Sequence, residues 1–413
     1  MKPLRWRFFF IAVLAGLILK GPAAWAFEFY YQFRAGDRFR ILSTVNYNVL
    51  VNRRLVFRNE TVNRIAQEIT ALTGDAGSAR INATSQSATR TTRFGVGGRI
   101  ESAAGDLFEW SRNYYSEFEQ DRLGRMTIGP QYMMPTVRDV PVFPDRALRP
   151  GETWSAPGVA VHDFRATFGF EEPLRLPFHA LYTFLGEREW RGRNYPAFSV
   201  SYRVLERPTP VPGRIFPRRI QESFDKTIFW DAEMGRVAAF EGNFRTTIEL
   251  SNGEIWEFHG RADAEVLESL PMDREEMLRE ILEDIENIPD ATVRLSDEGI
   301  VISLEDIQFA PDSAVLLPGE VEKLSAIADI LMRHPDRDIL VTGHTALAGS
   351  AESRMRLSIE RAGVVADYLL RRGVRSPDRV VIRGYGAERP VADNLSEEGM
   401  RRNRRVEIII LEN

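Results

Sequence analysis

Apolar and polar residues alternate along residues 27 to 268, in short runs that are rich in aromatic and β-branched side chains. Such runs are typical of β-strands, and the first two strands are expected at Phe27–Phe33 and Phe39–Val51. The residues on both sides of 191–194 predict a hairpin, and residues 227–266 predict an antiparallel meander. We therefore expect an all-β region that forms either a sandwich or a curved antiparallel sheet.

A proline-rich stretch at 135–157 interrupts this β-rich region. It is either a long loop within one unit or a boundary between two, and we favour two β units that meet near 135–158. Arginines such as Arg40, Arg64 and Arg203 interrupt the apolar runs. Because a strand in lipid needs one uniformly apolar face, we expect this sheet to contact water instead.

A change to helical spacing marks the end of the β-rich region. Apolar residues keep a helical repeat between Met277 and Ile288, and most of the positions between them are acidic. Asp273 followed by Glu276 forms a helix start that is similar to a capping box. We expect a linker helix over 269–290, followed by a final domain.

The final domain, residues 291–413, alternates strands with helices. Residues 291–295 and 300–304 flank a turn and predict a hairpin. Further along, the pattern predicts helices over 317–334 and 351–371 and strands over 339–342, 380–383 and 406–411. The apolar faces of both helices need a sheet to cover, so we expect an α/β sandwich in a multidomain chain.

The N-terminus has the composition of an export signal. Basic residues precede an apolar run from Phe8 to Leu19, and Ala24-Trp25-Ala26 is a small-x-small cleavage site. The run is shorter than the ~20 residues that a membrane-spanning helix needs. We interpret residues 1–26 as a cleaved signal peptide and expect no transmembrane segment after cleavage.

The overall composition narrows the range of functions. The 413 residues carry 54 basic and 59 acidic side chains, a net charge of −5, which gives no reason to expect nucleic acid. Because there is no cysteine, thiol catalysis and thiolate metal sites are excluded. The 5 histidines form no metal-type pair, and no nucleophile elbow or phosphate loop occurs. We therefore expect neither an enzyme nor a bound metal or cofactor.

Five short blocks in the final domain form a recognisable pattern. They are Ile307-Gln308-Phe309 with Ser313 and Leu316, Thr342-Gly343-His344-Thr345, Leu357-Ser358-Ile359-Glu360-Arg361-Ala362, Gly384-Tyr385-Gly386 with Pro390, and Asn403-Arg404-Arg405-Val406-Glu407-Ile408. In this order and spacing they resemble the OmpA-like, peptidoglycan-associating domain family. A variant of the second block, preceded by a long β-rich region, is similar to OmpA-like proteins of spirochaetes.

The resemblance implies non-covalent binding of the peptidoglycan stem peptide. In the family, the Asp of a G-H-T-D turn takes the ammonium of diaminopimelate, and the Arg of L-S-x-x-R-A takes its carboxylate. A bidentate guanidinium suits that carboxylate. Arg361 matches the Arg. Asn403 and Arg404 are expected either to line the same pocket or to cap and brace the last strand.

Two positions depart from the family's pattern. Ala346, next to Thr345, stands where the family has the Asp, and Arg354 stands where it has an Asn. The loss of one partner of a desolvated charge pair costs about 2–5 kcal/mol. A site that holds Arg354 and Arg361 is expected to prefer a carboxylate without a neighbouring ammonium.

Two hypotheses follow for the whole chain. In the first, it is a periplasmic protein that associates with peptidoglycan near the cell wall or outer membrane. It then binds another diamino acid, such as ornithine, or uses Glu352 or Glu360 as the missing acid. In the second, the domain has lost wall binding and serves as a protein-interaction module. In both, we expect an envelope protein as a partner, and the β-rich region is expected to bind a protein or a lipid.

Overall fold

The computed structural model describes residues 26–74, 77–102, 107–268, 273–286, 288–305 and 316–412. The expected signal peptide, apart from Ala26, lies outside these residues, and so does the block Ile307-Gln308-Phe309 with Ser313. Within the described ranges, no helix combines the length and the apolar character that a membrane crossing requires.

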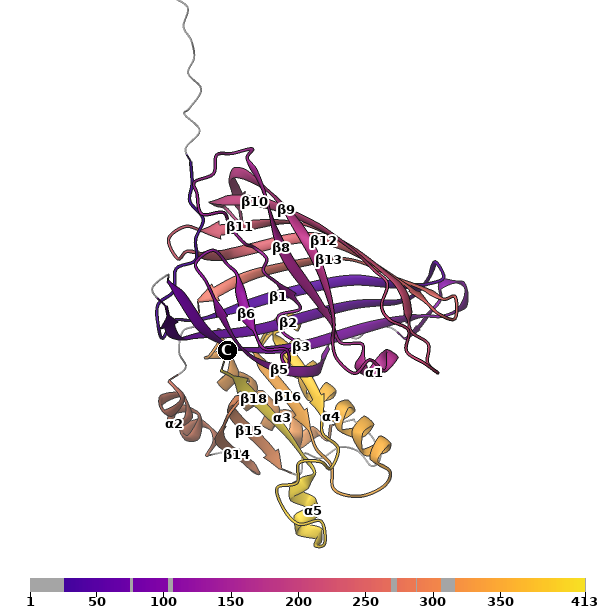
Figure 1. Cartoon of the computed structure of the whole chain (residues 1–413). Coiled ribbons are helices and arrows are strands. Elements are labelled where there is room, and N and C mark those ends of the chain that lie inside the picture. The colour runs from indigo at the N-terminus through magenta and orange to yellow at the C-terminus, as the bar shows by residue number, and fades with distance from the viewer. Residues whose placement is uncertain are drawn as a thin grey trace, which may run out of the picture.

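The β-rich region forms one strongly curved antiparallel sheet (Figure 1). Its strands are β1 (Arg38–Val51), β2 (Arg54–Thr73), β3 (Ser78–Phe94), β4 (Ile100–Ser102), β5 (Phe108–Gln120), β6 (Met126–Ile128), β7 (Val137–Arg138), β8 (Thr153–His162), β9 (Leu174–Trp190), β10 (Arg193–Glu206), β11 (Pro217–Asp231), β12 (Arg236–Leu250) and β13 (Ile255–Glu268), with two short helices, η1 (Val96–Gly98) and α1 (Arg165–Phe168). The hydrogen-bonded order is β6-β5-β3-β2-β1-β13-β12-β11-β10-β9-β8-β7, and β4 pairs with β3.

The hairpin and the meander are confirmed. Between β9 and β10, Arg191 has a φ of 49° and Gly192 a φ of 81°, so both central residues adopt the left-handed conformation of a two-residue turn whose twist suits paired strands. Strands β11, β12 and β13 follow one another as antiparallel neighbours.

The strand expected at Phe27–Phe33 does not form. Within it only Phe27 pairs, in an isolated bridge with Leu148. Phe29 is instead buried in the core, where its ring lies 5.1 Å from that of Phe143 and 6.0 Å from that of Trp230. Aromatic packing therefore accommodates the apolar residues of this segment, without a strand ladder.

The two faces of the curved sheet differ. We call the face that carries the large aromatic core the inner face; Trp154, Tyr182, Phe198 and Trp230 lie on it, and all are buried. The proline-rich stretch contributes Phe143 to the same core. The strands before and after this stretch join one sheet through the pairing of β1 with β13.

The C-terminal part has an α/β architecture. Its elements are α2 (Arg274–Ile285), β14 (Ala291–Ser296), β15 (Gly299–Glu305), α3 (Pro318–Met332), β16 (Ile339–Gly343), α4 (Ala351–Arg371), η2 (Pro377–Arg379), β17 (Val380–Gly384), α5 (Glu397–Asn403) and β18 (Arg405–Leu411). The strand order is β14-β15-β18-β16-β17, and within this order β16 and β17 are the neighbours that pair in parallel. The expected hairpin, strands and two long helices are confirmed, whereas α5 was not expected.

Helix α2 starts as its sequence predicts. The Asp273 side chain accepts a hydrogen bond from the backbone N of Glu276 at 2.9 Å. Ile281 and Ile285 are buried together with residues of α3 and α4. The helix is thus part of the C-terminal core and does more than connect two regions.

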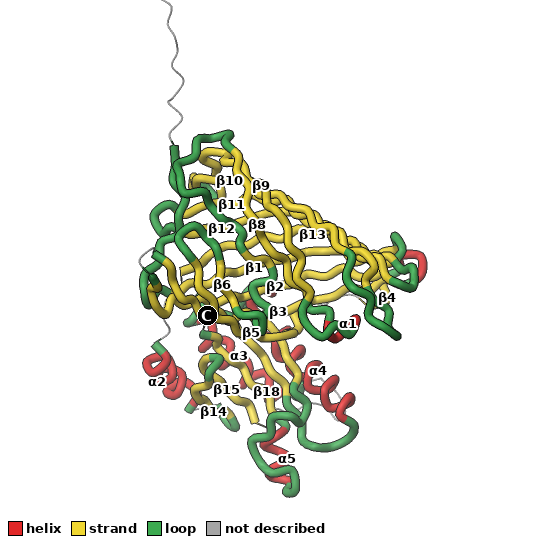
Figure 2. Tube along the Cα trace, viewed as in Figure 1, coloured by secondary structure: helices red, strands yellow, loops and turns green. Residues whose placement is uncertain are grey.

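The outer face of the curved sheet packs directly on the C-terminal sheet (Figure 2). Val62, Phe108 and Trp110 from the first share one buried cluster with Leu340 and Ile409 from the second. In addition, β17 pairs in parallel with β5. The two parts of the chain are therefore held against each other by core contacts and by a shared ladder.

Candidate functional site

The described motif blocks meet around the ends of β16 and β17, beside α4. The backbone of α4 lies very close to the strands, and this close packing is possible because two motif positions are glycines. A Cβ atom on Gly343 would lie 1.9 Å from the backbone O of Ser358, and one on Gly384 would lie 2.5 Å from Ser358 Oγ. Any larger residue at these positions would push α4 away from the sheet.

Hydrogen bonds tie the blocks together. Buried Ser358 Oγ accepts from the backbone N of Gly386 at 2.9 Å and donates to Met355 O at 2.7 Å. The backbone N of Thr345 donates to Gly386 O at 2.8 Å. The N of Leu347 donates to Asn394 Oδ1 at 3.0 Å. We call this assembly of the 343–349 turn, the first half of α4 and the 385–396 loop the motif site.

Two of the expected ligand residues are arginines on α4. Arg354 is half-buried, donates from Nη1 to the backbone O of Gly349, and lies beside Gly386. Among the described residues, no carboxylate lies within ion-pairing distance of its guanidinium, and none of them neutralises its charge. Arg361, two turns further along, is half-buried and takes part in an interaction within the chain.

The 343–349 turn is closed and apolar at the position of the missing acid. Ala346 is 6% exposed and Thr345 is 7% exposed. Thr345 Oγ1 is enclosed, yet it has no hydrogen-bond partner among the residues that the structure describes. An enclosed hydroxyl without a partner is a feature that a bound polar group would satisfy.

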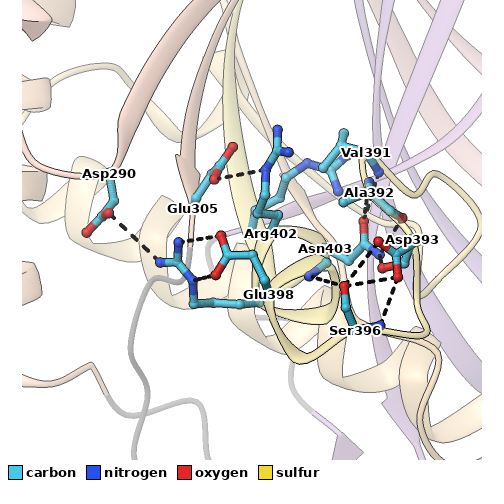
Figure 3. Close-up of polar contacts among 12 residues, drawn as sticks. Asp290, Glu305, Val391, Ala392, Asp393, Ser396, Glu398, Arg402 and Asn403 are labelled. Carbon is cyan, nitrogen blue, oxygen red and sulfur yellow. Dashed lines mark hydrogen bonds and ion pairs between the residues drawn. The ribbon is translucent and has the colours of Figure 1, made fainter.

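Asn403 and Arg404 are placed differently from the arginines on α4. Figure 3 shows the Asn403 amide directed into the 391–394 segment. Its Oδ1 accepts from the backbone N atoms of Val391 and Ala392, at 2.8 and 3.0 Å, and its Nδ2 donates to Ala392 O at 2.9 Å. Since the residue is fully buried, its amide shapes the loop. Arg404 is half-buried and directly follows α5 as its C-cap, where its backbone N donates to Met400 O.

A buried network of charged and polar side chains includes His344 of the 343–349 turn. Arg405 Nε donates to Glu407 at 2.9 Å, and His344 Nε2 lies 3.6 Å from the other Glu407 oxygen. Burial raises the pKa of Glu407, but the hydrogen bond from His344 and the charge of Arg405 lower it further, so the pKa lies below its usual range. Burial also lowers the pKa of His344. The network therefore places a carboxylate, and an imidazole that is neutral at pH 7, next to the motif site.

Cations also surround Tyr385 of the same site. The guanidinium groups of Arg383 and Arg389 lie 4.6 and 4.0 Å from its ring centroid, and its ring stacks on that of His344. Burial raises the pKa of Tyr385. Its hydroxyl is enclosed without a hydrogen-bond partner among the described residues. The surroundings of the motif site are thus rich in positive charge.

The acids near the site are few. Glu360 is exposed and lies 3.9 Å from Arg356 on the outer side of α4, and Glu352 is exposed in the first turn of that helix. Asp393, an exposed carboxylate in the loop that touches the 343–349 turn, was not predicted as a site residue from the sequence. Its Oδ1 accepts from the backbone N of Leu395 and from Ser396, which lowers its pKa.

Comparison with known proteins matches the same part of the chain. The model of the OmpA family matches residues 308–404. The peptidoglycan-binding protein ArfA of Mycobacterium tuberculosis is 41% identical over 104 residues, which are 25% of this chain and 32% of ArfA. The chain thus matches only the smaller part of that relative's length.

The peptidoglycan-associated lipoprotein of Pseudomonas aeruginosa is 37% identical over 114 residues, which cover 28% of this chain and 67% of that protein. A solved outer membrane protein structure from Borrelia burgdorferi is 33% identical, with 29% of this chain and 96% of that chain covered and a TM-score of 0.25. Through its C-terminal domain, the chain belongs to the OmpA family.

Proposed function

We propose that this chain is a periplasmic cell-envelope protein whose C-terminal domain associates non-covalently with peptidoglycan through the motif site. Supporting this proposal, relatives of the domain are named for peptidoglycan binding or association. The β-rich region then faces away from the wall-binding motif site, toward an envelope partner. No catalytic step is part of the proposal.

The observation that carries the proposal is the position of Arg354 on α4 beside the 343–349 turn, with Arg361 two turns further along the same helix. Two half-buried guanidinium groups lie two helical turns apart, and Arg354 has no acidic partner among the described residues. A carboxylate of the stem peptide provides the two acceptor oxygens that a guanidinium binds best. The enclosed Thr345 hydroxyl offers one further polar contact.

The ammonium of a diamino acid needs a different partner from the one in the family. Ala346 cannot provide a charge, and Glu360 is on the exposed side of α4. Asp393 is the acid that we assign to this role, because its loop contacts the 343–349 turn through the bond between Leu347 and Asn394. Exposure weakens such a pair, so binding is expected to be modest in affinity.

Co-sedimentation of the mature full-length chain with purified sacculi tests the proposal. The wild type should pellet in a saturable way, and Arg361→Ala should lower its affinity by about ten-fold or more, as expected for a lost charge-assisted bond. Arg356→Ala is the matched control, because Arg356 is an exposed arginine on the same helix. Asp393→Asn should weaken binding less than Arg361→Ala does.

The absence of the family's Asp favours a second candidate, in which the domain is an interaction module without wall binding. In that case the wild type stays in the supernatant, and Ala346→Asp restores pelleting. A wild type that does not pellet, or an Arg361→Ala variant that pellets as well as the Arg356→Ala control, contradicts the assigned site.

A further inference from the structure

A row of aromatic rings crosses the inner face of the curved sheet. Phe178, Tyr202, Phe224 and Phe244 come from four neighbouring strands, β9 to β12, and their rings stack at centroid distances of 4.0, 5.5 and 5.9 Å, with interplanar angles of 11–12°. Tyr47 on β1 continues the row at 6.2 Å from Phe244. The row spans five strand spacings, about 24 Å at ~4.8 Å each.

A glycine makes the continuous row possible. Gly260 on β13 lies between Phe244 and Tyr47 in the strand order. A Cβ atom on it would lie 2.6 Å from the Phe244 ring and 2.6 Å from Tyr47 Cβ. Because position 260 has no side chain, the two rings can approach across an intervening strand.

The rings at one end of the row are not covered by the core. Tyr202 and Phe178 are buried, whereas Phe224, Phe244 and Tyr47 are half-buried. Next to Tyr47 the inner face continues with small polar residues of β2 and β3, where Thr61 bonds to Thr89 at 2.9 Å. The inner face thus presents partly uncovered aromatic rings beside a polar strip.

A single cation lies among these rings. Lys226 of β11 is on the inner face, with Nζ 5.5 Å from the centroid of Phe224 and 5.0 Å from that of Phe240. Its neighbours across the ladders are Val200 on β10 and Gly242 on β12, neither of which carries a charge. Among the described residues, no carboxylate lies within ion-pairing distance of its amine.

The other inward titratable groups of this part of the sheet are engaged elsewhere. Glu222, four residues before Lys226 on β11, lies 3.0 Å from His162 Nε2 and accepts from Thr246. The acids next to Lys226 along the chain and across the ladder, Asp225 and Glu241, alternate to the outer face. A charge in apolar surroundings is costly, so a lysine kept there points to a ligand.

We propose that the inner face of the curved sheet binds a long-chain fatty acid, with the carboxylate on Lys226 and the acyl chain along the aromatic row. The ligand is assigned one negative charge because Lys226 is the one cation among the inward side chains between Ile220 and Trp230 of β11. A phosphate group, which carries more charge, would call for several cations. This inference does not depend on wall binding by the C-terminal domain.

The charge of Lys226 is compatible with this role at neutral pH. Desolvation by burial lowers the pKa of Lys226 from 10.5 to about 8, which leaves the amine mostly protonated at pH 7. Cation–π contacts with Phe224 and Phe240 hold the ammonium without neutralising it. An incoming carboxylate therefore meets a charge for which no anion among the described residues competes.

Fluorescence titration of the mature full-length chain with cis-parinaric acid tests the proposal. Palmitate should displace this probe about ten-fold more effectively than hexadecanol, which has an equivalent chain and no charge. Lys226→Met should abolish that preference, whereas Lys226→Arg should keep it. Arg203→Met is the matched control, since Arg203 is exposed on the outer face of neighbouring β10.

Each result decides the proposal. A wild type that binds the probe without saturation excludes a fatty acid site, and equal displacement by palmitate and hexadecanol excludes a role for the charge. The comparison of the two ligands on the wild type remains decisive even if Lys226→Met does not fold. Loss of the palmitate preference in Arg203→Met would show that a general change of charge, and not Lys226, determines binding.

Discussion

Lys226 illustrates how a single residue can reduce stability in favour of binding. Its amine is charged at neutral pH in both the folded and the unfolded chain, but only the folded chain surrounds it with rings. A fold that needed only a stable core would place an apolar residue at this position. We therefore expect the lysine to destabilise the ligand-free protein.

Lys226→Met should raise the free energy of unfolding at pH 7 by about 1–3 kcal/mol, the value of a partly screened shift in pKa from 10.5 to about 8. Below pH 8 the Lys226 amine is protonated in both the folded and the unfolded chain, so the lysine lowers the free energy of unfolding by its full amount. Between pH 8 and 10.5 the folded wild type releases its proton first, and its stability rises toward that of the variant. Denaturant unfolding of both proteins at pH 7, 9 and 10.5 measures this; a gap that is absent or independent of pH contradicts it.

Ala346 is the residue at which this domain departs most from the family's charge pattern. Ala346→Asp should restore an ammonium partner and increase affinity for diaminopimelate-containing sacculi by about 30-fold or more. Because position 346 is 6% exposed, the new carboxylate should also destabilise the ligand-free chain by about 1–3 kcal/mol.

Sedimentation and thermal unfolding of Ala346→Asp, beside an Ala346→Ser control, measure the two effects. Tighter binding by the serine variant as well would show that polarity, and not charge, was missing. Unchanged binding by Ala346→Asp would place the ammonium of the ligand elsewhere.

At the residue level, the sequence predicted the candidate site residues that belong to a motif and did not predict the others. Arg361 was predicted because it matches the Arg of the L-S-x-x-R-A block, and Arg354 because it stands where the family has an Asn. Lys226 carries no local signal, since only the fold brings Phe224 and Phe240 around it. Asp393 was missed for the same reason, because a contact between distant loops puts it near the site.

Among the secondary-structure elements, the 385–396 loop depends most on one side chain. Asn403 is buried and bonds to Val391, Ala392 and Asn394. Asn403→Ala should lower the free energy of unfolding by about 2–4 kcal/mol, because several enclosed backbone groups lose partners. Sacculus binding should weaken too, since the loop positions Asp393.

Urea unfolding and sacculus sedimentation of Asn403→Ala measure both effects. Asn194→Ala, at an exposed asparagine of β10, is the control and should change neither quantity. If Asn403→Ala unfolds as the wild type does but no longer binds, then Asn403 contacts the ligand instead of bracing the loop.

Periodic sequence patterns predicted the elements that have two distinct faces. The long helix α4 and the meander β11–β13 were correctly predicted because each repeats its apolar positions over several turns or strand positions. Helix α5, with 7 residues, is too short to show a repeat. The segment Phe27–Phe33 has the composition of a strand, but tertiary packing of Phe29 overrides that local preference.

For the molecule as a whole, a buried ion pair fixes how the two parts meet. Arg64 of β2 donates from Nε to Asp338 at 2.6 Å, with side chains that are 8% and 6% exposed, and also bonds to the backbone O of Asp378. Arg379 reaches the other Asp338 oxygen at 2.7 Å. Burial raises the pKa of Asp338, but Arg64 and Arg379 lower it further, so its charge is retained.

Arg64→Ala should lower the free energy of unfolding by about 2–4 kcal/mol and loosen the junction between the sheets, because the buried Asp338 carboxylate loses one of its cationic partners. Hydrogen exchange at β5 and β17 should increase in this variant. Arg38→Ala removes an exposed ion pair with Glu68 on the same sheet and should have little effect. Equal exchange in the two variants would show that the buried pair does not hold the junction.

This junction could not be predicted from the sequence. Arg64 was interpreted as one of several arginines that keep the strands in contact with water, and nothing near it indicated an acid 274 positions away. The outward residues Val62 and Phe108 likewise need a second domain to explain their burial. Patterns in one strand identify an apolar face, but not the surface that covers it.

Isothermal titration of the mature full-length chain with a purified peptidoglycan stem-peptide fragment is the decisive measurement for wall binding by the motif site. We predict one saturable site per chain, binding that is retained in Arg356→Ala, and at least about ten-fold weaker binding in Arg361→Ala. Absence of binding by the wild type, or equal affinities for Arg361→Ala and Arg356→Ala, would contradict this prediction.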